Sequence, residues 1–183
     1  MVPCSLTVRV AIIGLGSIGR RHRDNFRALG CEVRSYDQSV QGWLPDALED
    51  TLIGCDGAVI CTPPESHVDI AWKALGAGCH LMIEKPVSHT LNGLGDLFAA
   101  CCNAKKVAMV AYPWRYEPSM HEKRRRVQED IGPILSFSCW YSYHTPNETA
   151  RRMGPLLDCS HAIDFMRWLI GSEPTAVHAS AAV

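Results

Sequence analysis

Three closely spaced glycines, Gly14, Gly16 and Gly19, constrain the fold of this chain more than any other feature. They follow residues 7–13, a β-branched run typical of a strand, and precede residues 18–29, whose apolar spacing indicates a helix. At such a corner the first glycine makes the turn, the second lets a ligand approach the backbone, and the third lets helix and strand pack closely. The spacing therefore predicts a βαβ unit that holds a dinucleotide.

The corner offers a site for a diphosphate, because unpaired N–H groups and the helix dipole favour anions at a helix N-terminus. The residues expected to hold it are Gly14, Gly16, Ser17, Ile18 and Gly19. Asp37 ends the second predicted strand, residues 31–36, where a carboxylate can accept hydrogen bonds from both ribose hydroxyls and repel a 2′-phosphate. This favours NAD as cofactor. Arg34 and the Arg20-Arg21 pair leave NADP as an alternative cofactor. A second alternative is a glycine turn that binds no ligand.

Strands and helices alternate along the first part of the chain. Further strands are predicted at residues 57–61, 79–83 and 106–111, and helices at residues 65–77 and 88–103. This order predicts an α/β fold, a Rossmann-type doubly wound parallel sheet covered on both faces.

Beyond Pro113 the regular alternation of predicted strands and helices ends. Helices are predicted at residues 117–129 and 156–170, and strands at residues 134–143 and 175–181. We therefore expect a dinucleotide-binding domain over residues 1–114 and an incomplete α/β (α+β) domain over residues 115–183.

Composition narrows the class of protein. A formal net charge of -1 gives no general attraction for nucleic acid or an anionic membrane, and no apolar run has the roughly 18 to 20 residues that a membrane span needs. Nine cysteines, an odd number with no signal peptide before them, indicate reduced thiols and a cytoplasmic protein. None forms a C-x-x-C pair, so we expect no metal site.

Glu84, Lys85 and Pro86 directly follow the strand predicted at residues 79–83. In an open α/β sheet the ligand crevice lies at the carboxyl ends of the strands, which places Lys85 beside the cofactor. Pro86 restricts Lys85 to an extended backbone and so fixes the direction of its side chain. The alternative is an ordinary solvated lysine at a strand end.

Asp158 and His161 lie three positions apart on a predicted helix and therefore share a face. A carboxylate on one imidazole nitrogen would fix the tautomer and strengthen the other nitrogen as a base. Asp158 could equally cap the helix and His161 could be a core histidine, so the pattern alone leaves both readings open.

Four motifs, in this order and spacing, resemble the Gfo/Idh/MocA oxidoreductase family. They are Gly14 to His22, Cys61-Thr62-Pro63-Pro64 with His67, Glu84-Lys85-Pro86, and Asp158 to Asp164 with Trp168-Leu169-Ile170-Gly171. The resemblance implies a Rossmann domain followed by a domain whose open antiparallel sheet carries the substrate site and often an oligomer interface. It also implies NAD(P)-dependent oxidation or reduction of a hydroxyl or carbonyl on a sugar, cyclitol or nucleotide sugar.

The resemblance assigns roles to single residues. Lys85 would polarise the reacting oxygen, and His161 would accept the proton with Asp158 orienting it. Arg115 would face the substrate. The remaining assignments are to the cofactor, with Thr62, Pro63, Pro64 and His67 near its ribose and Glu84 at the nicotinamide end.

The chain also departs from the family. Asp158 and His161 follow D-x-x-H rather than D-x-x-x-H, and the family is usually about twice as long. We therefore expect a truncated or fragmentary member, or one completed by another subunit or a homo-oligomer. A dinucleotide-binding protein without turnover, either a remnant or a regulator, is the alternative function.

Overall fold

The computed structural model describes residues 7–39, 47–140, 159–178 and 180. The chain divides into two compact units, Met1–Ala111 and Tyr112–Val183. The expected division, after residue 114, lies just inside the second unit.

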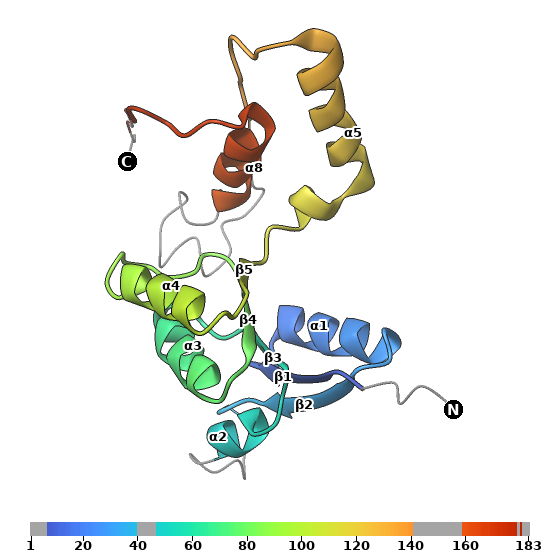
Figure 1. Ribbon diagram of the computed structural model, residues 1–183, viewed down its shortest axis with the longest axis vertical. Coiled ribbons are helices and arrows are strands. Elements are labelled where there is room, and N and C mark those ends of the chain that lie inside the picture. Colours follow the sequence, from blue (N-terminus) through green and yellow to red (C-terminus); the bar gives the residue numbers. More distant parts are fainter. Residues whose placement is uncertain (1–6, 40–46, 141–158, 179, 181–183) are drawn as a thin grey trace. The chain divides into compact units, whose positions relative to one another are not determined.

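A five-stranded parallel sheet forms the centre of the first unit (Figure 1). Its strands are β1 (Arg9–Ile13), β2 (Glu32–Tyr36), β3 (Gly57–Ile60), β4 (His80–Ile83) and β5 (Ala108–Val110). The order β2-β1-β3-β4-β5 changes direction at β1, which is where doubly wound sheets bind ligands. Ile13 pairs with Tyr36 on one side and Ile60 on the other, and Ile60 pairs with Ile83, so the carboxyl ends of these strands lie level at one edge. The predicted Rossmann fold is confirmed.

Helices cover both faces of the sheet, with α1 (Ser17–Ala28) on one side in Figure 1. The other side carries α2 (Ala47–Leu52), α3 (His67–Gly76) and α4 (Leu94–Asn103). Neighbouring residues of a strand point to opposite faces, so Ile12 packs in the cluster that Phe26 of α1 joins, while Ile13 packs with Leu52 and Ala71. Two apolar layers therefore hold the sheet edge in place.

The sequence missed α2 and placed the start of α4 too early. Pro45 and Gly42 precede α2 and hid it, but Leu48 and Leu52 bury its apolar side against the sheet. The helix predicted at residues 88–103 begins only at Leu94, because Gly93 before it adopts the left-handed region at φ 71°. Neither difference moves the carboxyl edge of the sheet.

The described part of the second unit is helical. Its elements are the 3-10 turn η2 (Pro113–Tyr116), α5 (Pro118–Arg126), the π turn η3 (Val127–Ile131) and α8 (Ser160–Ile170). Gly171 ends α8 in the left-handed region at φ 73°. Both predicted helices are present, although residues 156–158 of the second lie outside the described residues.

The strands predicted in this unit are wrong wherever the structure describes them. Residues 134–140 and 175–178 form no strand, and Leu135 and Trp140 are each 96% exposed. Alternating apolar residues favour an extended chain, but a strand is stable only when neighbouring strands satisfy its N–H and C=O groups and cover its apolar face. The remaining residues of both predictions lie outside the described ranges.

Cysteines of the described chain are free thiols, several of them in the core of the first unit. Burial raises the pKa of Cys79 to about 11, and burial together with the Glu84 carboxylate raises that of Cys61 to about 12. These two thiols therefore stay protonated and pack as small apolar side chains. Among the described residues, no helix is long and apolar enough to cross a membrane, and no group of three or more His, Cys, Asp or Glu side chains could hold a metal ion.

Candidate cofactor-binding site

The glycine corner lies between β1 and α1, and two of its glycines are packed too closely for a side chain. Gly14 has φ 92°, its N–H donates to the Tyr36 carbonyl at 2.7 Å, and a Cβ there would lie 2.8 Å from the Cys61 carbonyl carbon. A Cβ at Gly19 would lie 1.9 Å from the Gly14 carbonyl oxygen. Both positions therefore require glycine for close backbone packing.

Gly16 differs from both, because a Cβ there would meet nothing within 4 Å. It is the N-cap residue of α1 and has no side chain to accept hydrogen bonds from the first turn, which also contains no acidic residue. Helix N-termini leave N–H groups unsatisfied, and these groups attract anions. The open backbone beside Gly16 therefore fits a diphosphate, as the spacing of the glycines predicts.

Asp37 lies one residue beyond β2 and reaches the glycine corner. Its Oδ2 accepts the Leu15 N–H at 2.6 Å, and its Oδ1 accepts the Ser39 N–H at 2.8 Å and the Ser39 hydroxyl at 2.6 Å. Burial raises the pKa of this carboxyl, but the Ser39 and Leu15 hydrogen bonds and the Arg20 charge outweigh it and leave the pKa lowered. Asp37 is thus an ionised, acceptor-only group at the site where a ribose is expected.

His67, the first residue of α3, contacts the loop that follows β3. This imidazole is 1% exposed, with Nε2 2.6 Å from the Thr62 carbonyl oxygen and Nδ1 3.0 Å from the Pro86 carbonyl oxygen. Both neighbours are carbonyl oxygens, which only accept, so each contact is a hydrogen bond only where the facing nitrogen carries hydrogen. The ring lies between the loops that follow β3 and β4. His67 is expected to line the cofactor together with Thr62, Pro63 and Pro64, and these assignments stay predictions. Its side chain is buried against the carbonyl groups of Thr62 and Pro86.

Glu84, directly after β4, is held by a partner that the sequence did not reveal. Its Oε1 lies 2.8 Å from His22 Nε2, and its Oε2 accepts the Lys85 N–H at 3.1 Å. Both side chains of the Glu84–His22 pair are 15% exposed, so the contact is largely shielded from water. His22 lies in α1, and the pair fixes this helix to the end of β4. Lys85 follows at the same edge, and its peptide bond to Pro86 is cis.

Arg115 of η2, expected on the substrate side, makes a bidentate ion pair with Asp164 of α8. Its Nε lies 2.8 Å from Oδ2 and its Nη2 2.6 Å from Oδ1. The Asp164 side chain is 8% exposed and that of Arg115 is 37% exposed. The hydrogen bonds that Arg115 donates to the Asp164 carboxylate raise the pKa of Arg115. Asp164 was part of a quoted motif, but no spacing pointed to this pairing.

His161 lies in the first turn of α8, packed among aromatic rings. Its ring stacks on Trp114 at 5.7 Å between centroids and 25° between planes, and meets Tyr112 edge-on at 5.7 Å. These contacts fix the plane of the imidazole. Asp158, its expected partner, lies outside the described residues, so the pairing stays a prediction.

Comparison with known families decides the identity of the fold. Residues 24–112 match the family described as "Oxidoreductase family, NAD-binding Rossmann fold", and residues 121–183 match the "GFO/IDH/MocA C-terminal domain". The chain belongs to the Gfo/Idh/MocA family. The match to an NAD-binding Rossmann family agrees with the cofactor predicted from the glycine corner.

Individual relatives share the fold but are longer. Inositol 2-dehydrogenase of Rhizobium meliloti (strain 1021) is 27% identical over 97% of this chain and 59% of its own length. The scyllo-inositol 2-dehydrogenase (NAD(+)) of Bacillus subtilis (strain 168) is 28% identical over 93% of this chain and 56% of its own. The structure of UDP-N-acetylglucosamine 3-dehydrogenase GnnA from Acidithiobacillus ferrooxidans aligns with a TM-score of 0.76 at 22% identity, over 97% of this chain and 62% of that one. The chain thus spans less than two thirds of the length of these Gfo/Idh/MocA proteins.

Proposed function

We propose that this chain is the nucleotide-binding part of an NAD-dependent dehydrogenase that acts on a hydroxyl or carbonyl of a sugar, cyclitol or nucleotide sugar. The observation that carries the proposal is the open backbone at Gly16 with the ionised Asp37 held beside it. The names of the inositol and nucleotide-sugar dehydrogenases that it resembles support this class of substrate.

The proposed cofactor site uses the carboxyl edge of the sheet. Backbone N–H groups of Gly16, Ser17 and Ile18 would bind the diphosphate, while Asp37 would accept hydrogen bonds from the adenosine ribose. A carboxylate has room for about four hydrogen bonds, and Asp37 accepts three from Leu15 and Ser39. We expect the exposed Ser39 hydroxyl to give way to a ribose hydroxyl.

The proposed chemistry rests on Lys85 and His161. A nicotinamide ring, when bound, accepts or delivers hydride. Lys85 would donate a hydrogen bond to the reacting oxygen, and His161 would take the proton from the substrate hydroxyl, oriented by Asp158. Arg115 uses two of its five N–H groups on Asp164, which leaves donors for a substrate oxygen.

Calorimetric titration with NADH and NADPH tests the cofactor proposal. We expect the whole chain to bind NADH at least about tenfold more tightly than NADPH, because Asp37 repels a 2′-phosphate. Asp37→Ala should remove most of this preference, and Ser39→Ala, a matched change beside it, should keep it. No binding of either nucleotide at millimolar concentration would refute the proposal.

Turnover requires a separate measurement, because a chain that binds NADH need not catalyse. NADH formation would be followed with myo-inositol, scyllo-inositol and UDP-N-acetylglucosamine in the presence of NAD. Lys85→Ala should reduce any activity by about 100-fold or more. Lys73→Ala removes an exposed lysine of α3 that pairs with Glu49 of α2, and it should leave the activity unchanged. NADH binding without turnover on any of these would favour the non-catalytic alternative.

A further inference from the structure

Glu84, the residue after β4, uses both of its carboxylate oxygens on contacts within the first unit. Oε1 lies 2.8 Å from Nε2 of His22, and Oε2 accepts the Lys85 N–H at 3.1 Å. The N–H of Glu84 donates to the Ile60 carbonyl at 2.9 Å, which continues the ladder between β3 and β4. The sheet therefore fixes the backbone of Glu84, and the contact with His22 fixes the direction of its side chain.

The environment of the Glu84–His22 pair makes this contact a strong one. An ionised carboxylate only accepts hydrogen bonds, so Nε2 of His22 is the donor. Both side chains are 15% exposed, so water competes little for either partner. A hydrogen bond to a carboxylate is also roughly twice as strong as one between neutral groups. His22 can therefore hold the carboxylate in one orientation.

The segment after Glu84 is contacted from the other face of the sheet as well. The Pro86 carbonyl oxygen lies 3.0 Å from Nδ1 of His67, the first residue of α3. His22 belongs to α1, and α1 and α3 lie on opposite faces of the sheet (Figure 1). Lys85 thus follows a residue tied to one helix and precedes a residue in contact with the other.

We infer that His22 is a positioning residue for Lys85. By holding Oε1 of Glu84 it presents Oε2 to the Lys85 N–H, and so it sets the orientation of the Lys85 backbone from which the side chain extends. His22 acts through Glu84 and needs no contact with the substrate. The inference rests on the proposed function, in which Lys85 polarises the reacting oxygen, and it names a further residue on which that step depends.

Amide hydrogen exchange, followed by NMR on the whole chain labelled with ¹⁵N, tests this link without any need for turnover. His22→Leu keeps an apolar side chain in place and removes the donor. We expect the Lys85 amide to exchange at least about tenfold faster in this variant, because Oε2 of Glu84 is no longer held beside it. The Glu84 amide, which donates to Ile60 within the sheet, should stay within about twofold of its rate in the parent protein.

Two further variants separate the hydrogen bond from the bulk of the ring. His22→Gln places an amide N–H near the position of Nε2 and should restore most of the protection at Lys85. His89→Leu changes an exposed histidine four residues beyond Lys85, and exchange at Lys85 should stay within about twofold of the parent rate. Circular dichroism melting of each variant shows whether it is folded.

Activity provides the second measurement, with NAD and whichever inositol or nucleotide sugar the parent protein oxidises. His22→Leu should lower kcat about tenfold or more, since a misplaced catalytic group loses rate, while NADH affinity stays within about twofold. His22→Gln should recover most of kcat. A purely structural role would change cofactor binding and turnover together.

The outcomes separate this inference from the proposed function. Unchanged exchange at Lys85 in His22→Leu overturns the inference, and so does equal acceleration throughout α1 and β4, which would show only a loosened helix. Unchanged kcat in His22→Leu overturns it too. Faster exchange confined to Lys85, in a chain that oxidises none of the substrates, supports the link through Glu84 and counts against the dehydrogenase proposal alone.

Discussion

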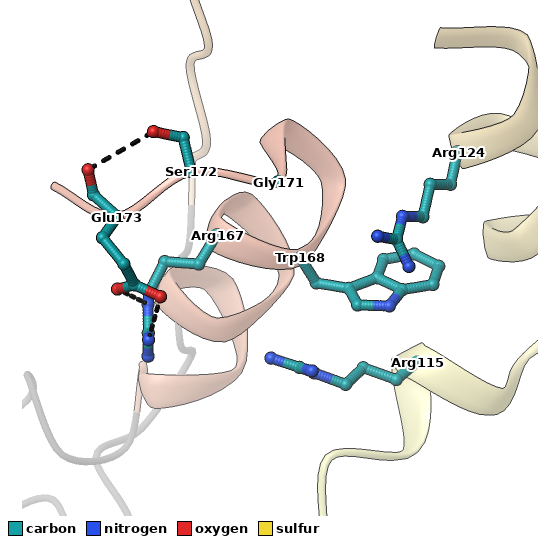
Figure 2. Close-up of a pocket in the computed structure, with 7 residues that line it drawn as sticks. All are labelled: Arg115, Arg124, Arg167, Trp168, Gly171, Ser172 and Glu173. Atoms are coloured by element: carbon teal, nitrogen blue, oxygen red, sulfur yellow. Dashed lines mark hydrogen bonds and ion pairs between the residues drawn. The ribbon is translucent and has the colours of Figure 1, made fainter. Parts of the chain in front are cut away.

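The glycine corner of the first unit and the arginines of the second, Arg115, Arg124 and Arg167 (Figure 2), are held in place in opposite ways. At the corner, the missing side chains of Gly14 and Gly19 let backbone pack on backbone, and Gly16 leaves a space open. The arginines are long side chains whose positions depend on partners such as Asp164 and Trp168. The first kind of site is specified by local backbone geometry, the second by contacts between distant residues.

The largest effect should come from adding one methyl group at the corner. Gly19→Ala places a Cβ 1.9 Å from the Gly14 carbonyl oxygen, so helix and turn must separate. We expect the free energy of unfolding in urea to fall by about 3 kcal/mol, despite the better helix propensity of alanine.

Gly16→Ala is the matched control, since a Cβ there meets nothing within 4 Å. Its stability should stay within about 0.5 kcal/mol of the parent protein, while NADH affinity falls because the methyl group occupies the space proposed for the diphosphate. If both variants are equally stable, close packing does not distinguish the two glycines.

A smaller effect is expected in the second unit from Asp164→Asn. This change removes the negative charge from a side chain that is 8% exposed and leaves Arg115 without its ion pair. We expect a loss of about 2 kcal/mol in unfolding free energy, less than for a fully buried pair because Arg115 is partly exposed. Glu173→Gln breaks a similar bidentate pair, which Glu173 makes with Arg167 at the surface, and should leave the melting temperature unchanged. Equal destabilisation by both would show that burial does not set the strength of these pairs.

The smallest effect is the pH dependence contributed by Asp37. Because its pKa in the folded protein lies below the ordinary value of 3.8, the ionised group stabilises the corner above that pH, and the stabilisation is lost as pH falls through the folded value. The melting temperatures of the parent protein and Asp37→Asn should therefore differ most near about pH 6 and converge below about pH 3.8. A difference that is constant across this range would mean that the charge of Asp37 does not stabilise the corner.

Local patterns in the sequence were enough to predict the corner and the parallel sheet. Glycine spacing and apolar runs report on backbone within a few residues, and this is the scale on which β1, the turn and α1 form. The Glu84–His22 and Arg115–Asp164 pairs escaped prediction because they join residues 62 and 49 positions apart. Such contacts depend on how elements pack, and no spacing encodes them.

The strands predicted at residues 134–143 and 175–181 show the converse error at the residues that the structure describes, 134–140, 175–178 and 180. Alternation is a property of the segment itself, whereas strand formation needs an adjacent strand. The motif that contains His67 did not reveal that its side chain is buried against the carbonyl groups of Thr62 and Pro86. A motif identifies the residues of a site more readily than the direction in which each side chain points.

The level ends of the parallel strands have an evolutionary consequence. Asp37, Cys61 and Glu84 each come one residue after the final pair of a ladder, so their side chains can change without breaking strand hydrogen bonds. Asp37 and Glu84 are nevertheless coupled to the scaffold through their contacts with the Leu15 N–H group and His22. The fold itself tolerates extensive sequence change, since the GnnA structure shares it at 22% sequence identity.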